Sequence, residues 1–229
     1  MSYTIESIAE CIGARRVGEC EATIDWLLTD SRSLSFPEET LFFALTTKRN
    51  SGARYIPDLY DRGVRNFVVT EEDFEKFKNG ELGKLSTLNF LIVANPLKAL
   101  QKLAEIHREE FKIPIIGITG SNGKTIVKEW LHQLLSPDRR IVRSPRSYNS
   151  QIGVPLSVWQ LNGEAELGIF EAGISEMGEM NALKRMIKPT IGILTNIGGA
   201  HQENFFSLQE KCMEKLTLFK DCDVVIYNG

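Results

Sequence analysis

Short apolar runs alternate with segments of helical periodicity along most of the chain. Runs rich in β-branched and aromatic residues predict strands, which we expect at 41–45, 66–69, 90–93, 113–119, 141–143, 167–171, 190–195 and 224–227. Apolar residues spaced by three and four predict helices, which we expect at 5–12, 56–62, 97–111, 124–135, 179–187 and 207–219. Such alternation is typical of an α/β protein with a parallel sheet and helices on both of its faces.

The pair Asn95-Pro96 marks a natural break between two domains, because proline disfavours helix in the residue before it. We predict that residues 1–95 form a small mixed α/β domain and that residues 96–229 form a parallel-sheet domain. The last apolar run, 224–227, predicts a strand with no helix after it to cover its face. We therefore expect the second domain to be an incomplete part of a larger one.

The composition is that of a globular protein without a dominant charge. The 229 residues include 27 basic and 30 acidic side chains, which gives a net charge of −3. This charge provides no field that would attract nucleic acid or an anionic membrane. No apolar run approaches the ~20 residues that span a bilayer. The four cysteines form no C-x-x-C pair, which is typical of reduced thiols in a cytosol. We expect a cytoplasmic monomer that binds no nucleic acid and does not insert into membranes.

The strongest chemical signal is the loop between the strand at 113–119 and the helix at 124–135. A glycine-rich turn that leads into a helix is predicted to hold polyphosphate, since backbone N–H groups and the helix dipole attract anions. Lys124 adds a mobile charge, and the Thr125 hydroxyl is placed to bind Mg2+. The first glycine is Gly117, one residue earlier than in the common G-x-x-x-x-G-K-[ST] pattern. A turn without function is the alternative, which the strand–loop–helix context disfavours.

Further polar residues are expected at the carboxyl ends of the predicted strands, where ligands gather in parallel sheets. Glu171 closes one apolar strand, and its carboxylate suits the hard Mg2+ ion. The alternative for Glu171 is a surface carboxylate that caps the following helix. His201 follows the small residues 198–200, which allow close approach to a ligand, although a packed or solvated histidine is the alternative.

Four motifs in this order resemble those of the Mur ligase family of peptidoglycan synthesis. They are Gly-Ser-Asn-Gly-Lys-Thr at 120–125, Tyr-Asn-Ser-Gln-Ile-Gly-Val-Pro at 148–155, Glu-Ala-Gly at 171–173 and Thr-Asn-Ile-Gly-Gly-Ala-His at 195–201. Residues 29–32 and 41–45 are similar to the UDP-binding domain of that family. The chain departs from the family pattern in having Ser51-Gly52-Ala53 where Asp-Gly-His is usual, and Ser150 where a second asparagine is usual.

The resemblance implies ATP and Mg2+ as cofactors and assigns roles to specific residues. The implied ATP-binding residues are Gly120, Ser121, Asn122, Gly123, Lys124 and Thr125. The implied catalytic residues are Lys124, Glu171, His201 and Lys215, and the implied metal-binding residues are Thr125, Glu171, His201 and Lys215. The implied substrate-binding residues are Ser31, Arg32, Lys48, Arg49, Asn50, Asn149 and Ser150. Family members also modify a lysine at the position of Lys215 with CO2, which gives a carbamate that helps to hold a second Mg2+.

The implied reaction is ATP-dependent ligation of a carboxylate to an amine through an acyl phosphate. The form of residues 149–155 is similar to that of members that add D-alanyl-D-alanine to UDP-N-acetylmuramoyl-tripeptide. Alternatives are a tripeptide-forming or folylpolyglutamate-like ligase, and a fragment that binds UDP-sugar and nucleotide without turnover. An unrelated phosphate-loop kinase or GTPase is a further alternative, although no Asn-Lys-x-Asp base-recognition motif occurs. The family has three domains, so the resemblance implies that this chain alone is inactive.

Overall fold

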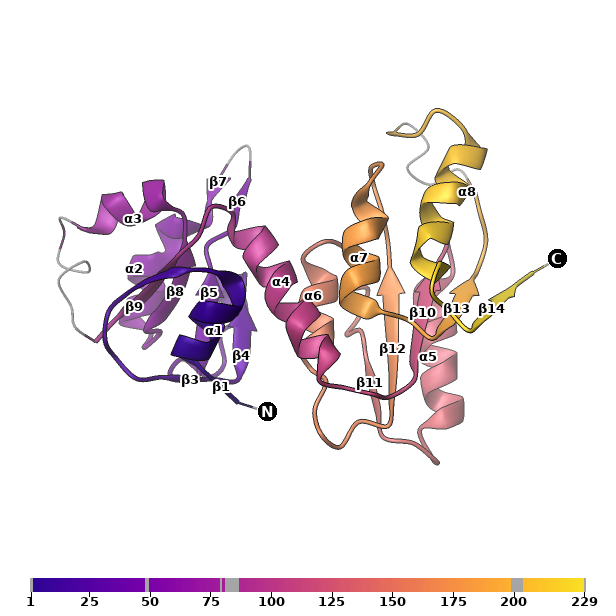
Figure 1. Cartoon of the computed structure of the whole chain (residues 1–229), viewed down its shortest axis with the longest axis horizontal. Coiled ribbons are helices and arrows are strands. Elements are labelled where there is room, and N and C mark those ends of the chain that lie inside the picture. Colours follow the sequence, from indigo (N-terminus) through magenta and orange to yellow (C-terminus); the bar gives the residue numbers. More distant parts are fainter. Residues whose placement is uncertain (1, 48–49, 79, 81–86, 199–203, 229) are drawn as a thin grey trace. The chain divides into compact units, whose positions relative to one another are not determined.

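The structure is a computed structural model that describes residues 2–47, 50–78, 80, 87–198 and 204–228 (Figure 1). It contains two compact units, Met1–Leu103 and Ala104–Gly229. The division falls inside helix α4 (Pro96–Glu109), which begins at the proline that marks the predicted domain break.

The first unit is built on a five-stranded sheet with the strand order β2-β9-β8-β5-β4. The strands are β2 (Arg15–Val17), β9 (Asn89–Ile92), β8 (Asn66–Val69), β5 (Thr40–Phe43) and β4 (Trp26–Leu28). All neighbours are parallel except β2, which runs antiparallel to β9. The strands predicted at 41–45, 66–69 and 90–93 correspond to β5, β8 and β9.

Helices and short strands complete this unit. They are α1 (Ile5–Ile12), α2 (Ile56–Asp61), α3 (Glu71–Lys78), the 3-10 turns η1 (Ser31–Ser33) and η2 (Gly52–Tyr55), and the strand pairs β1 (Tyr3–Thr4) with β3 (Thr23–Ile24) and β6 (Thr46–Thr47) with β7 (Asn50–Ser51). Helix α1 begins after Thr4, which accepts the Ser7 N–H, and ends at Gly13 with φ +65°. Those are the caps that the sequence predicts for 5–12.

The second unit is a parallel sheet with the strand order β11-β12-β10-β13-β14, which confirms the predicted parallel α/β arrangement. Its strands are β10 (Ile115–Thr119), β11 (Ile141–Arg143), β12 (Leu167–Ala172), β13 (Ile191–Leu194) and β14 (Val224–Tyr227). Its helices after α4 are α5 (Lys124–Leu135), α6 (Gly153–Val158), α7 (Glu179–Ile187) and α8 (Leu208–Leu216), followed by the 3-10 turn η5 (Thr217–Phe219).

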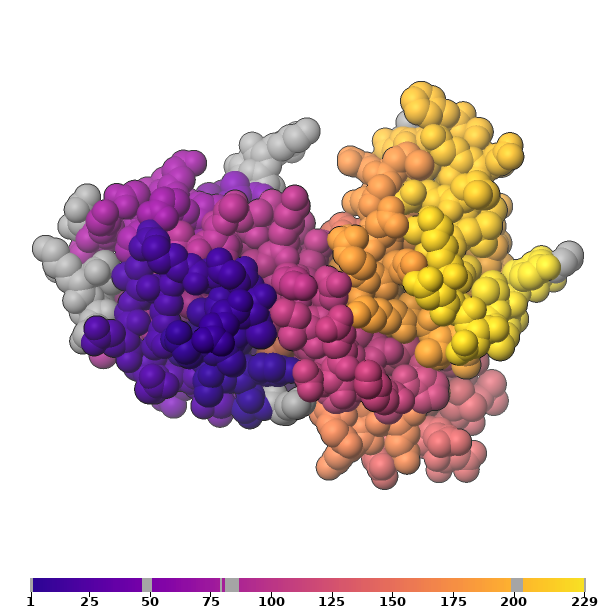
Figure 2. Space-filling model, viewed as in Figure 1, coloured from indigo at the N-terminus to yellow at the C-terminus, as the bar shows by residue number. Residues whose placement is uncertain are grey.

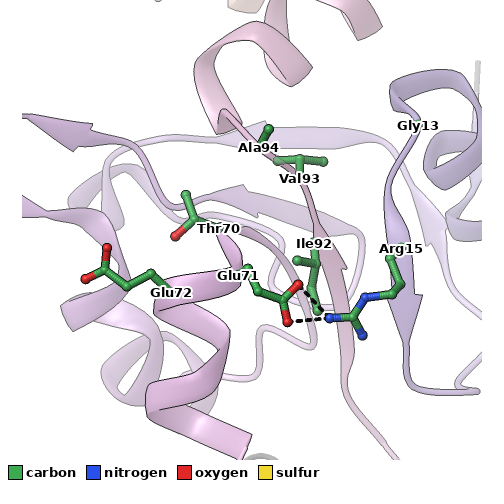
Figure 3. A pocket seen from close by; sticks show the side chains of 8 residues that line it. All are labelled: Gly13, Arg15, Thr70, Glu71, Glu72, Ile92, Val93 and Ala94. Atoms are coloured by element: carbon green, nitrogen blue, oxygen red, sulfur yellow. Dashed lines mark hydrogen bonds and ion pairs between the residues drawn. The ribbon is translucent and has the colours of Figure 1, made fainter.

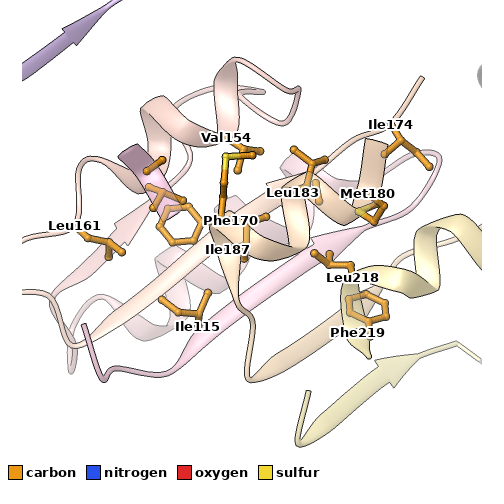
Figure 4. Close-up of a cluster of buried hydrophobic side chains, with 14 of the residues drawn as sticks. Ile115, Val154, Leu161, Phe170, Ile174, Met180, Leu183, Ile187, Leu218 and Phe219 are labelled. Atoms are coloured by element: carbon orange, nitrogen blue, oxygen red, sulfur yellow. The ribbon is translucent and has the colours of Figure 1, made fainter. Parts of the chain in front are cut away.

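Helices cover both faces of this sheet. On one face, α6, α7 and η5 pack against strand residues such as Ile115 and Phe170, as the cluster in Figure 4 shows. On the other face, α5 places Val127, Leu131 and Leu135 against alternate residues of the same strands, including Ile116 and Ile118. The sheet therefore lies between two helical layers, and the alternation of side chains along β10 feeds both cores.

Two parts of the predicted apolar pattern face outward. Trp130 and Leu134 belong to the apolar spacing that predicts the helix at 124–135, but they are 63% and 72% exposed. They lie four residues apart and share a helix face with Ile126, whereas Val127, Leu131 and Leu135 occupy the face that meets the sheet. All four residues of β14 are exposed, and this strand stands out at the yellow end of the space-filling view (Figure 2).

No helix within the described parts of the chain is both long enough and apolar enough to cross a membrane.

Candidate functional site

The phosphate-loop signal lies where the sequence predicts it, between β10 and the first residue of α5. Gly117, however, lies in strand β10 and not in the turn. A Cβ at position 117 would lie 2.8 Å from Pro189 Cβ. The glycines of the turn are Gly120, with φ +148°, and Gly123, with φ +82°. A Cβ on Gly120 would lie 1.9 Å from Thr195 Oγ1, so this turn requires glycine for close approach as well as for backbone freedom.

The loop is tied to the segment that follows β13. Asn196 accepts the N–H of Ser121 through its carbonyl at 2.9 Å and the N–H of Asn122 through its side chain at 3.0 Å. Thr195 Oγ1 donates to Asn122 O at 2.6 Å. Two loop N–H groups that the sequence suggested for phosphate are therefore occupied by protein acceptors. The groups left for an anion are the first N–H groups of α5, which have no intrahelical acceptor.

Three lysines gather around the loop. Lys124 Nζ and Lys215 Nζ both donate to Gly120 O, at 2.9 and 3.2 Å. Lys211, one turn before Lys215 on α8, donates to Gly198 O at 2.6 Å. Lys211 and Lys215 are only 1% and 3% exposed, so the site holds concentrated positive charge. Lys211 was not singled out in the sequence.

The environment of Lys124 and Lys215 opposes the charge of both side chains. Burial, together with the positive charges of Lys124 and Lys211, lowers the pKa of Lys215 to about 8. Burial also lowers the pKa of Lys124, against the opposing effect of Glu171. A bound anion would reduce the repulsion between the lysines and would compensate for the hydration that they lose on burial.

Glu171 is fully buried at the end of β12, which rules out the alternative of a surface capping carboxylate. Its Oε2 accepts a hydrogen bond from the Thr125 hydroxyl at 3.0 Å and from Asn149 Nδ2 at 3.2 Å. The Thr125 hydroxyl also lies 3.3 Å from Ser147 Oγ. The structure thus brings together three residues that the sequence suggested separately: Thr125, Asn149 and Glu171.

Lys128 completes this group and is not among the site residues predicted from the sequence. Its Nζ lies 2.9 Å from Glu171 Oε1 and donates to Ser144 O at 2.8 Å and to Arg146 O. Lys128 stands three residues after Thr125, so both side chains share one face of α5. That spacing is the sequence signal that could have identified it.

This donor set fits a Mg2+ ion that is shared with phosphate. No group of three or more His, Cys, Asp or Glu side chains with metal-binding geometry occurs among the described residues. Mg2+ commonly uses one or two carboxylates together with substrate phosphates, rather than a cage made only of protein. Glu171 Oε2 and the Thr125 hydroxyl, placed next to the loop, provide hard oxygen atoms of that kind.

Ser150 has a local structural role, because its Oγ accepts the Gly153 N–H at 3.2 Å at the start of α6. Asn149 approaches the backbone after β12 closely: a Cβ on Gly173 would lie 2.7 Å from Asn149 Oδ1. His201 and the Lys48-Arg49 pair lie outside the described residues, and Asn50 is described only as part of the backbone of β7.

In the first unit, Ser31 and Arg32 form a turn directly after β4. Asp30 caps this turn and also pairs with the Arg32 side chain, with a shortest N–O distance of 2.6 Å. These hydrogen bonds lower the pKa of Asp30 and raise that of Arg32. Arg62 donates to Ser31 O at 2.8 Å and holds the turn from α2. The Arg32 side chain is 86% exposed, which leaves it accessible to a ligand.

A pocket of about 420 Å3 lies at the carboxyl ends of β8 and β9 in the same unit (Figure 3). Thr70 and Val93 follow these strands, and an ion pair between Arg15 and Glu71 at 2.6 Å borders the space. Both partners of the pair are more than half exposed, so the pair adds little stability. The sequence reading did not identify this pocket.

Comparisons with known proteins agree with the arrangement of the second unit. Residues 118–229 match the family described as Mur ligase middle domain. The chain is 35% identical over 214 residues to the UDP-N-acetylmuramoyl-tripeptide–D-alanyl-D-alanine ligase of Borreliella burgdorferi. The match covers 91% of this chain and 45% of that protein. The chain therefore spans about half the length of this relative.

Solved structures show the same fold. MurF from Acinetobacter baumannii superposes with a TM-score of 0.83 at 23% identity, covering 99% of this chain and 49% of that one. MurF ligase from Thermotoga maritima, solved in complex with ADP, gives a TM-score of 0.72 at 24% identity over 88% of this chain and 45% of that one. From its motifs, its fold and these matches, the chain belongs to the Mur ligase family.

Proposed function

We propose that this chain carries the UDP-binding and ATP-binding parts of a ligase that joins D-alanyl-D-alanine to UDP-N-acetylmuramoyl-tripeptide. The observation that carries the proposal is the convergence of Thr125, Asn149 and Glu171 beside a loop surrounded by lysines. A relative that is 35% identical to this chain over 214 residues is named for this activity. The activity is proposed for the protein as its gene encodes it.

Lys124 and the N–H groups at the start of α5 bind the ATP phosphates in this proposal. The positive charges of Lys211 and Lys215 add to the attraction, because both side chains are buried next to the loop. Gly120 and Gly123 let the backbone turn closely around the phosphates, with Ser121 and Asn122 held in place by Asn196. Phosphoryl transfer relies on such positioning and on charge neutralisation.

Glu171 and Thr125 hold Mg2+ in this proposal, with His201 and Lys215 as further ligands. Mg2+ held by these residues would supply positive charge next to the phosphoryl group that is transferred. A carbamate on Lys215 would turn a cation into an oxygen ligand for a second Mg2+. The lowered pKa of Lys215 supports this modification, because CO2 reacts with the neutral amine.

The proposed reaction consists of a phosphoryl transfer followed by an acyl transfer, and these residues position the reactants. A carboxylate oxygen of the tripeptide attacks the γ-phosphorus, and the bond to the β-phosphate oxygen breaks to release ADP. The amine of D-alanyl-D-alanine then attacks the carbonyl carbon of the acyl phosphate, loses a proton and expels phosphate. The lysines around Gly120 stabilise the phosphoryl oxygens during the first transfer.

Ser31, Arg32 and the 48–50 segment bind the UDP end of the substrate, while Asn149 and Ser150 contact its peptide end. Arginine suits phosphate because its guanidinium offers bidentate hydrogen bonds. Ser31 and Arg32 follow β4, which is parallel to its neighbour β5, and ligands gather beyond the carboxyl ends of parallel strands. The proposal implies a cytoplasmic monomer, with ATP and the UDP-linked peptide as its soluble partners.

Product analysis tests the proposal. The gene-encoded protein is incubated with ATP, Mg2+, UDP-N-acetylmuramoyl-tripeptide and D-alanyl-D-alanine, and the products are identified by mass spectrometry. We expect a pentapeptide product with one ADP for each ligation. Ligation of a single amino acid to a shorter acceptor would indicate a different Mur-type ligase. Tight binding of ATP and of the UDP-linked peptide without formation of ADP would indicate a module that binds these compounds but does not catalyse ligation.

A further inference from the structure

Lys128 and Glu171 form an ion pair that is closed off from solvent. Both side chains are 0% exposed, and Lys128 Nζ lies 2.9 Å from Glu171 Oε1. A buried ion pair is a weak source of stability, because desolvation offsets much of the attraction and an apolar pair of similar volume is often as stable. A pair at this position therefore calls for a reason other than stability.

The contacts of Lys128 divide the two oxygens of Glu171 between different tasks. Oε1 lies against the Lys128 ammonium and accepts no hydrogen bond of good geometry from the described residues. Oε2 points toward the loop and accepts from the Thr125 hydroxyl and Asn149. Oε1 is thus held by the positive charge of Lys128, whereas Oε2 lies beside the hydroxyl of Thr125, which is expected to bind Mg2+.

Lys128 also connects Glu171 to the segment that carries Asn149. Its ammonium donates to the carbonyl oxygens of Ser144 and Arg146, and Ser144 Oγ accepts the Glu171 N–H at 3.2 Å. Glu129 lies 3.1 Å from the same ammonium but is partly exposed. One buried side chain therefore fixes both Glu171 and the start of the segment that leads to Asn149.

We propose that Lys128 is a positioning residue for the metal-binding carboxylate. It restrains Glu171 so that Oε2, next to the Thr125 hydroxyl, is the oxygen presented to Mg2+. This inference rests on the proposed function, because it assumes that Glu171 binds a metal that is shared with nucleotide phosphate. Residues that orient a metal ligand typically change metal affinity about 10- to 100-fold when they are replaced.

The test separates metal binding from nucleotide binding. The affinity of the protein for ADP is measured by calorimetry in Mg2+ and again in EDTA, for the wild type and for Lys128→Met. We expect the gain in ADP affinity that Mg2+ provides to fall about 10-fold or more in the variant. The affinity in EDTA should change much less, since Lys128 faces Glu171 and the carbonyls of Ser144 and Arg146 rather than the loop.

Two further variants keep the test decisive. Lys184→Met removes a lysine of the same unit that pairs with Asp221 at 2.5 Å, and it should leave both affinities unchanged. Lys128→Gln keeps a hydrogen-bond donor without the charge and carries the test if Lys128→Met does not fold. An equal loss of affinity in Mg2+ and in EDTA would reveal a general structural role and overturn the inference.

The remaining outcomes distinguish the inference from the function on which it rests. A folded Lys128 variant with the full wild-type gain from Mg2+ overturns the inference and leaves the proposed function intact. A wild-type protein that binds ADP without any gain from Mg2+ overturns the metal site and the inference together. A wild-type protein that binds no ADP contradicts the proposed function itself.

Discussion

Lys124 and Lys215 share one acceptor, the carbonyl oxygen of Gly120, which they approach to 2.9 and 3.2 Å from two different helices. Lys215 is buried and Lys124 is half-buried, their ammonium groups repel each other, and the lowered pKa of each reflects the loss of hydration. A polyphosphate would supply the missing negative charge. The site is therefore arranged for an anion that the protein itself does not provide.

The backbone of the loop gives the sharpest structural prediction. Gly120→Ala should destabilise the protein, because Cβ would meet Thr195 Oγ1 at 1.9 Å and φ is +148°. We expect a loss on the order of 1–3 kcal/mol in the free energy of unfolding, together with loss of nucleotide binding. Urea denaturation measures the first and calorimetry the second. Gly163→Ala, where a Cβ meets nothing within 4 Å, is the matched control and should change neither.

The pKa of Lys215 predicts a pH dependence of stability. This pKa is lowered from 10.5 to about 8 in the folded protein, so between those values the unfolded chain binds more protons. The contribution of Lys215 to the free energy of unfolding should therefore rise as the pH increases from 8 to about 10.5. The stability of the wild type minus that of Lys215→Met should show this rise, whereas the difference from Lys184→Met should not. Denaturation in CO2-free buffer measures both differences, and a wild-type-minus-Lys215→Met difference that falls with pH would contradict the assignment.

A carbamate on Lys215 makes a separate prediction about activity. Lys215→Ala should lose most ligation, and short carboxylic acids should restore part of it by supplying oxygen atoms where the carbamate would be. The measurement is the initial rate as a function of acetate concentration, with Lys220→Ala as a control lysine nearby in the chain. Full activity of Lys215→Ala without any added acid would show that ligation does not need a carbamate on Lys215.

Arg32 should matter for substrate binding and not for stability. Its side chain is 86% exposed and pairs with the nearby Asp30, so Arg32→Ala should leave the melting temperature nearly unchanged. We expect the affinity for the UDP-linked peptide to fall about 10-fold or more, since hydrogen bonds between a guanidinium and phosphate are stronger than those between neutral groups. Calorimetric titration measures this, with Arg139→Ala as the control. Unchanged affinity would place the UDP end elsewhere in the first unit.

Local patterns in the sequence were enough to predict most of the second unit. The apolar run of β10, the glycines of the loop and the periodicity of α5 are local features, and each strand of the parallel sheet appears where its run predicts it. The helix α3 was missed because most of its eight residues are charged and its apolar residues are few. The strands of two or three residues in the first unit are too short to show a period.

The site was predictable only in part, because burial depends on partners that are distant in the sequence. Lys128 and Lys211 resemble ordinary surface lysines until Glu171 and the Gly198 carbonyl are brought against them. The opposite error occurred at Trp130, which shares the apolar helical spacing of its neighbours but is exposed on the outer face of α5. Asn196 appears in the sequence only as part of the motif at 195–201, whereas in the structure it holds the loop through Ser121 and Asn122.

Transfer of a labelled oxygen tests the central claim most directly. The tripeptide carboxylate is labelled with 18O, the gene-encoded protein catalyses ligation, and the released phosphate is analysed by mass spectrometry. Ligation through an acyl phosphate predicts one labelled oxygen in each phosphate, and Lys124→Ala should reduce the rate about 100- to 1000-fold. Release of unlabelled phosphate during ligation, or equal rates for the wild type and Lys124→Ala, would contradict the account.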